Sequence, residues 1–181
     1  MKRLQRAAII VSLIEALRDN DSWCGETNIQ KATYFLKELT HVPLEYEFIL
    51  YKHGPYSFEL KEELTALRAD TILELKSPNP SYGPSFFPGK MRDYVMDRFP
   101  KTVKRFSSNI DFVASHLGKK DVNELECLST ALYVLRESPK CDKKQRAKKI
   151  IEIKPHIDYS DCCEAVEEVD QIVREADQFT R

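Results

Sequence analysis

Residues 44–60 read LEYEFILYKHGPYSFEL and join an alternating segment to a Gly-Pro turn and then to a helix. From Leu44 to Tyr51 every second residue is a candidate to face inward, which is the period of a half-buried strand. The positions expected to face inward are Leu44, Tyr46, Phe48 and Leu50. A helix is predicted over residues 56–69, since Leu60, Leu64 and Leu67 recur at helical spacing.

Two helices are predicted upstream of this stretch. Apolar residues at positions 10, 13, 14 and 17 indicate an amphipathic helix over residues 3–18. The next helix spans residues 27–40, with Thr27 and Gln30 as a capping box and Pro43 beyond its end. Downstream, residues 71–75 predict a short strand, and the Pro- and Gly-rich segment 77–89 predicts a long loop or hairpin tip. This order of elements is typical of a winged helix with the loop as its wing.

The remainder of the chain is predicted to be helical. Helices are expected at 90–98, from Pro100 to Leu117, from the cap Asp121 onward, at 142–153, and from Ser160 or Asp161 onward. The expected fold class is α+β, mainly α. A winged-helix-like region, residues 1–98, carries a small sheet, and a helical region, residues 99–181, packs on it with a shared core.

Composition and charge exclude several classes of protein. The 181 residues hold 28 Lys and Arg against 29 Asp and Glu, so no global field attracts nucleic acid. The longest apolar run, Ala7–Val11, is far too short to cross a bilayer, and a cytoplasmic protein without a membrane partner is expected. Charge is uneven, because residues 140–149 are basic and residues 158–177 are acidic. These runs predict two solvated helix faces that attract one another.

Catalytic and metal-binding signals are weak in this sequence. Its four histidines are scattered, and no GxGxxG, phosphate-loop or HExxH motif occurs. The five cysteines form no CxxC pair, so reduced core thiols are expected. Cys141, His156, Cys162 and Cys163 stay open as an alternative zinc set. The sequence therefore predicts a non-enzymatic protein with no catalytic residue, no metal and no cofactor.

The turn within the opening stretch is the candidate binding site. Its residues are Tyr51, Lys52, His53, Gly54, Pro55, Tyr56 and Ser57. Loops that carry such residues between rigid elements are where recognition tends to lie. Two alternatives stay open: a structural turn whose tyrosines pack against the body, and a small-anion site at the helix start.

Further aromatic residues surround the proline-rich loop. Tyr82, Phe86, Phe87 and Tyr94 form either an exposed interaction patch or the anchor of the loop on the core. Trp23, the single tryptophan, is expected in the core.

Two segments of the chain resemble a known family. NIQKATYFLKE, followed by PLEYEFILYKHGPYSFELKEELTALRADTILEL, is similar to the SocA-like (Panacea) antitoxin-domain family, nearest to its uncharacterised YwgA-like members. The matching residues in the first segment are Gln30, Lys31, Tyr34, Phe35 and Leu36. Those in the second are Phe48, Tyr51, Gly54, Pro55, Tyr56 and Ser57. Ala32 and Thr33 depart from the pattern, which usually has a larger apolar residue there.

The resemblance implies a mainly helical fold and a domain that binds and neutralises a protein toxin. We therefore expect a protein-binding module, an antitoxin or adaptor, with a protein partner. The alternative is a DNA-binding transcriptional regulator of winged-helix type. Its phosphate-contacting residues would be Lys143, Lys144, Arg146, Lys148 and Lys149, because glutamates dominate the helix at 56–69 and Gln30, Lys31 and Lys37 offer little. A hydrolase built from His and Cys gathered in space is a third hypothesis.

Overall fold

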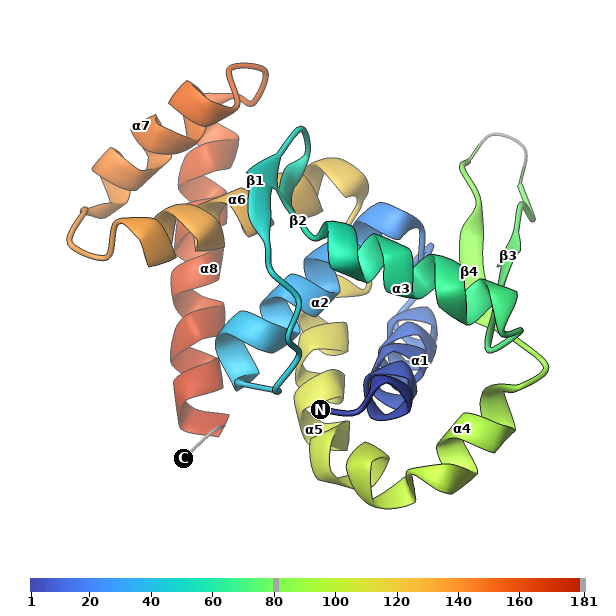
Figure 1. Ribbon diagram of the computed structural model, residues 1–181. Coiled ribbons are helices and arrows are strands. Elements are labelled where there is room, and N and C mark those ends of the chain that lie inside the picture. Colours follow the sequence, from blue (N-terminus) through green and yellow to red (C-terminus); the bar gives the residue numbers. More distant parts are fainter. Residues whose placement is uncertain (80–81, 180–181) are drawn as a thin grey trace.

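The computed structural model describes residues 1–79 and 82–179 and is mainly helical (Figure 1). The helices are α1 (Arg3–Asp19), α2 (Glu26–Thr40), α3 (Phe58–Ala69), α4 (Arg92–Arg98), α5 (Pro100–Leu117), α6 (Val122–Glu137), α7 (Lys143–Ile153) and α8 (Tyr159–Phe179). The strands are β1 (Ile49–Tyr51), β2 (Gly54–Tyr56), β3 (Leu73–Lys76) and β4 (Ser85–Pro88). They form two separate antiparallel hairpins, β1–β2 and β3–β4. The α+β, mainly α class is therefore confirmed.

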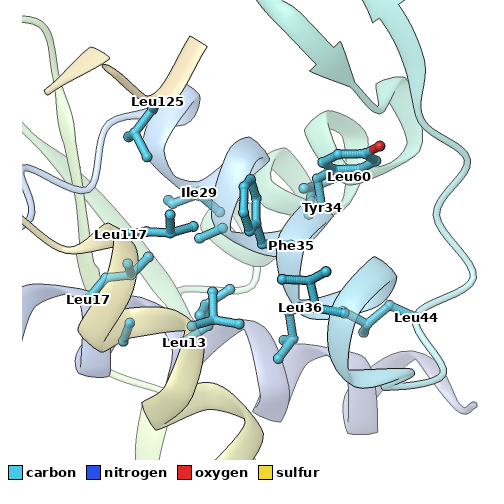
Figure 2. Packing of buried hydrophobic residues seen from close by; sticks show 14 of the residues in the cluster. Leu13, Leu17, Ile29, Tyr34, Phe35, Leu36, Leu44, Leu60, Leu117 and Leu125 are labelled. Carbon is cyan, nitrogen blue, oxygen red and sulfur yellow. The ribbon is translucent and has the colours of Figure 1, made fainter. Parts of the chain in front are cut away.

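Helix α1 lies at the centre of the molecule. Its predicted bounds are confirmed, but five consecutive residues, Ala7–Val11, are fully buried. Five consecutive buried residues cover every side of the helix, so α1 has neighbours all around over Ala7–Val11, while Ser12, Glu15 and Arg18 further along are only half-buried. Figure 2 shows Leu13 and Leu17 of α1 packed near Leu117 of α5 and Phe35 of α2. One hydrophobic cluster contains residues from both sides of residue 98. The division of the chain into a region 1–98 and a region 99–181 stays a prediction.

The predicted strand from Leu44 is only partly present. The alternation is confirmed, because Leu44 and Tyr46 are buried while Glu45 and Glu47 are exposed. Ladder pairing, however, begins only at Ile49. The extended backbone alone produces the alternating side chains, and no second strand among residues 1–79 and 82–179 lies beside residues 44–48 to complete a sheet.

The caps of two helices test the capping predictions. At α2, Gly25 is the cap, and its N–H donates to Asn28 Oδ1 at 3.2 Å, so the predicted Thr27–Gln30 box is wrong. Gln30 is instead engaged by the β1–β2 hairpin, as described below. At α6 the prediction is confirmed, because Asp121 Oδ1 accepts from the backbone N–H groups of Asn123 and Glu124.

The segment predicted as a proline-rich loop contains strand β4. Residues 80–81 of that segment lie outside the described residues, and the winged-helix arrangement stays a prediction. Phe86 is 5% exposed and Phe87 lies under the Arg18 guanidinium, so both anchor the hairpin. Trp23 is half-buried rather than in the core: its Nε1 donates to Gly83 O at 2.9 Å, and its ring contacts Tyr82.

Within residues 1–79 and 82–179, no helix combines the length and apolar character that crossing a membrane requires.

Candidate functional site

Hairpin β1–β2 turns through two residues, Lys52 and His53. Its register pairs Tyr51 with Gly54, Leu50 with Pro55 and Ile49 with Tyr56. Hydrogen-bonded and non-hydrogen-bonded pairs alternate along an antiparallel ladder, and Pro55 has no N–H to donate. The Leu50–Pro55 pair is therefore the non-hydrogen-bonded one, and the N–H and C=O of Leu50 point away from β2.

Gly54 allows β2 to lie directly against α6. Its φ is +85°, a backbone conformation that residues with a Cβ rarely adopt. A Cβ at this position would lie 2.9 Å from Ser129 Oγ and 3.1 Å from Thr130 Oγ1. Glycine at position 54 therefore fixes both the turn and the distance of the hairpin from α6.

Helix α2 holds the hairpin from behind through two buried side chains. Gln30 Nε2 donates to Ser57 O, and Ser57 N donates to Gln30 Oε1, both at 2.9 Å. Lys31 Nζ donates to Pro55 O at 2.8 Å and is 1% exposed. Burial and, to a smaller degree, the nearby Lys154 lower the pKa of Lys31 to about 8, against a partial opposing effect of Glu126.

A second support comes from α6 and from Lys154, just beyond α7. Lys154 Nζ donates to the carbonyls of Tyr51 and Lys52 and lies 3.0 Å from Glu126 Oε1. Nδ1 of His53 lies 3.0 Å from the other carboxylate oxygen of Glu126. Burial raises the pKa of Glu126, but His53 and Lys154 more than offset it and hold the pKa below its ordinary value. We name Gln30, Lys31, Glu126 and Lys154 the polar clamp.

The outer face of the hairpin carries aromatic rings. Tyr51 and Phe58 are 45% and 49% exposed, and Tyr56 is half-buried. Their ring centroids lie 5.2 to 5.7 Å apart. Tyr56 Oη donates to Glu26 Oε1 at 2.6 Å, which fixes the middle ring. We name Tyr51, Tyr56 and Phe58 the aromatic cluster.

The seven residues predicted for the site divide into two groups. Tyr51, Lys52 and His53 are exposed, and Tyr56 is partly so. Gly54, Pro55 and Ser57 are buried, so a partner cannot reach their side chains. These three position the hairpin because each packs against, or bonds to, α2 or α6.

Sequence reasoning missed most of the polar clamp. The sequence predicts Gln30 in a capping box and weighs Gln30 and Lys31 as weak nucleic-acid contacts, but they are 0% and 1% exposed. A usable signal existed for Lys31, since Tyr34 and Phe35 lie three and four residues further on the same helix face, and a lysine on an apolar face needs a buried acceptor. Glu126 and Lys154 carry no such signal, because the acceptors of Lys154 are backbone atoms about 100 residues away.

The basic helix α7 faces the acidic helix α8, as the charge runs predict. Arg146 is 5% exposed and donates to both carboxylate oxygens of Asp170, at 2.7 and 2.8 Å. Lys143 Nζ lies 3.4 Å from Glu167 Oε1. Arg146 is therefore wrong as a phosphate contact of the DNA-binding alternative, whereas Lys144 and Lys148 are exposed.

The alternative zinc set is not assembled. No group of three His, Cys, Asp or Glu side chains suited to a metal ion occurs within the described parts of the chain. His156 Nε2 instead lies 3.5 Å from Glu126 Oε1. Cys162 is buried against α6, whereas Cys141 and Cys163 are half-buried, so the expectation of core thiols holds for part of the set.

No protein-family model matches this chain, and no curated protein is significantly similar to it. The likeness to SocA-like proteins thus stays a prediction. Its two segments nevertheless meet in space, because Gln30 and Lys31 of the first bond to Ser57 and Pro55 of the second.

Proposed function

We propose that this protein is a non-enzymatic protein-binding module, an antitoxin or adaptor, whose partner docks on the aromatic cluster of hairpin β1–β2. One observation carries the proposal. Aromatic rings stand exposed on a hairpin whose back is fixed by the buried polar clamp.

Rigid exposed aromatic rings favour binding for two physical reasons. Tyr and Phe are enriched in protein interfaces relative to the rest of the surface. A surface already held in its binding conformation also loses little entropy when a partner docks. The bonds from Lys31 and Lys154 to the hairpin backbone supply that rigidity. Tyr51 and Phe58 are then the contact residues, and Lys52 and His53 flank them.

The backbone of β1 adds a second mode of contact. Leu50 presents its N–H and C=O on the edge of β1 that faces away from β2, as its non-hydrogen-bonded pairing with Pro55 requires. An extended segment of a partner can pair with such an edge and place its alternate side chains beside the rings. This geometry supports recognition of a strand-forming segment.

The charge beside the aromatic cluster indicates the charge of the partner. A hollow of about 430 Å³ between residues 45–46 and α3 is bordered by four glutamates and one cation, Arg6. The glutamates are Glu45, Glu59, Glu62 and Glu63. Glu45 and Glu63 pair with the Met1 ammonium, Arg3 and Arg6, so the negative charge without an ion pair to a described residue is that of Glu59 and Glu62. Charge complementarity at an interface steers association and suppresses wrong partners, so the partner should carry Lys or Arg here.

The polar clamp supports a structural role rather than catalysis. Lys31 and Lys154 donate to carbonyls of the hairpin, and Glu126 lies within ion-pair distance of Lys154, His53 and His156. Groups bonded in this way hold a loop in place.

The test compares capture of partner proteins from native lysate by matched variants. Tyr51→Ala/Phe58→Ala should lose the captured protein, because it removes both exposed rings. Tyr82→Ala/Tyr159→Ala, which removes two equally exposed rings elsewhere, should retain it. Circular dichroism confirms that both variants fold. Equal capture by the two folded variants would refute the proposal.

A further inference from the structure

Helices α4 and α5 meet at the opposite end of the molecule from hairpin β1–β2 (Figure 1). Residues 90–105 carry six cationic and two acidic side chains, a net charge of +4 in a chain whose net charge is −1. Arg92 is neutralised by Glu15 and Asp93. The excess positive charge therefore resides on the other cations of this segment.

Four of these cations point into solvent. Arg98, Lys101, Lys104 and Arg105 are exposed, and none forms an ion pair with a described residue. Three of them lie within the first two turns of α5, an 18-residue helix that begins at Pro100. The positive end of the helix dipole adds to their charge. Asp97 is an exposed acidic side chain of this segment, and the four exposed cations outnumber it.

Aromatic rings accompany the cations. Tyr94 is 51% exposed, and the Arg98 guanidinium carbon lies 5.9 Å from its ring centroid. Phe106 is half-buried, and the Arg105 guanidinium carbon lies 5.2 Å from its ring centroid. Arginines beside aromatic rings are elements with which proteins bind single strands, because bases stack on the rings while cations contact phosphates.

A hollow of about 330 Å³ accompanies these side chains. Lys101, Thr102, Arg105 and Phe106 form one wall, and Met1, Gln5 and Pro43 border the rest. Glu45 is the carboxylate nearest to Met1, and it is neutralised by the Met1 ammonium at 2.7 Å and by Arg6 at 3.3 Å. The lining of the hollow is mainly apolar, which suits the face of a base, and Lys101 and Arg105 at its border are placed for a neighbouring phosphate.

We propose that the α4–α5 corner, defined as Tyr94, Arg98, Lys101, Lys104, Arg105 and Phe106, binds single-stranded nucleic acid. The aromatic rings favour a single strand over a duplex, since stacking requires base faces that a duplex hides. They also separate this corner from α7, where Lys144 and Lys148 are exposed without any neighbouring aromatic residue in the same helix. The inference is independent of the partner of hairpin β1–β2.

The experiment titrates fluorescein-labelled oligodeoxythymidine, about 12 nucleotides long, with the full chain and follows anisotropy. Salt is varied from about 50 to about 200 mM. We expect log affinity to fall with log salt at a slope of about −0.7 for each neutralised phosphate. Lys101→Ala/Lys104→Ala/Arg105→Ala should make that slope shallower by about 2. Tyr94→Ala should weaken binding about tenfold and leave the slope unchanged.

The matched control is Lys144→Ala/Lys148→Ala, which removes two exposed cations of α7 and should change neither affinity nor slope appreciably. Polyglutamate serves as a competitor and should displace the oligonucleotide poorly. Absence of binding at the lowest salt would overturn the proposal, and so would an equal loss in the α7 variant. Tighter binding to a duplex of the same length, full affinity in Tyr94→Ala, or efficient displacement by polyglutamate would overturn it too.

Discussion

The two hairpins of this protein are both antiparallel strand pairs, but they differ in the burial of their aromatic residues. The rings are covered at hairpin β3–β4 and partly exposed at hairpin β1–β2. Hairpin β3–β4 turns Phe86 into the core and covers Phe87 with the Arg18 guanidinium, whose carbon lies 3.6 Å from the ring centroid. At hairpin β1–β2, Tyr51 and the adjoining Phe58 at the start of α3 are about half exposed. The difference lies in what holds each hairpin to the body of the protein.

Hairpin β3–β4 is held mainly by its own side chains and backbone, with one added support from Arg18 of α1, which donates to Ser85 Oγ and Phe86 O. Phe86 packs in the core, Phe86 N donates to Cys24 O, and Ser85 Oγ donates to Trp23 O. Hairpin β1–β2 is held by side chains of other elements, namely Lys31 of α2 and Lys154, which bond to its backbone. Support of the second kind leaves the rings of the hairpin available to a partner.

The largest expected effect comes from breaking the polar clamp. Glu126→Ala leaves the buried Lys154 ammonium without its carboxylate, since both side chains are 5% exposed. We expect a loss of about 3–5 kcal/mol in the free energy of unfolding, measured by urea denaturation. The control Glu167→Ala removes a pair whose carboxylate is 69% exposed and should cost less than about 1 kcal/mol. Similar losses of unfolding free energy in both variants would contradict the stabilising role of the polar clamp.

Truncating Phe86 of β4 and Phe58, which starts α3 beside hairpin β1–β2, compares the aromatic side chains of the two regions. Phe86→Ala removes a core ring and should destabilise the protein by about 3–5 kcal/mol. Phe58→Ala removes a half-exposed ring and should cost about 1 kcal/mol or less. Thermal and chemical denaturation give both values. If Phe58→Ala proves as damaging as Phe86→Ala, the aromatic cluster is structural and is not a free surface.

The buried Lys31 should make stability depend on pH. Its pKa is about 8 in the folded protein and 10.5 when unperturbed, so between these values the unfolded chain binds the extra proton. Stability contributed by Lys31 therefore rises with pH over this window, by up to ~3 kcal/mol. The measured quantity is the difference in unfolding free energy between the wild type and Lys31→Met, at pH values across the window. A difference that does not change with pH would show that Lys31 is not held in a desolvated site.

The smallest of these effects concerns backbone conformation. Gly54→Ala places a Cβ at positive φ and against Ser129, and should cost about 1–3 kcal/mol. Gly83→Ala, beside β4, meets no atom within 4 Å and should change stability by about 0.5 kcal/mol or less. Urea midpoints distinguish the two. Equal tolerance at both positions would mean that β2 can move away from α6 without cost.

Local sequence signals predicted the helices well. The end of α5 at Leu117, the start of α5 at Pro100 and the Asp121 cap of α6 are each set by residues within one turn of the boundary. The strand at Leu44–Tyr51 was predicted too long, because strand pairing depends on a neighbour that periodicity cannot reveal.

The candidate site was predicted in part. The Tyr51–Ser57 turn was found from its own residues, but which of them face outward depends on α2 and α6. Lys154 and Glu126 reach the hairpin across about 100 and about 70 residues of chain, a distance at which local patterns carry no information. Phe58 was missed because it was counted with the helix that it starts.

Photo-crosslinking tests the central claim most directly. A benzophenone side chain is placed in turn at Tyr51, Phe58, Tyr82 and Tyr159, all of them exposed aromatic positions. Irradiation in native lysate should join one and the same protein to positions 51 and 58 and leave positions 82 and 159 free of it. Crosslinking at all four positions alike, or at 82 and 159 alone, would contradict a partner docked on hairpin β1–β2.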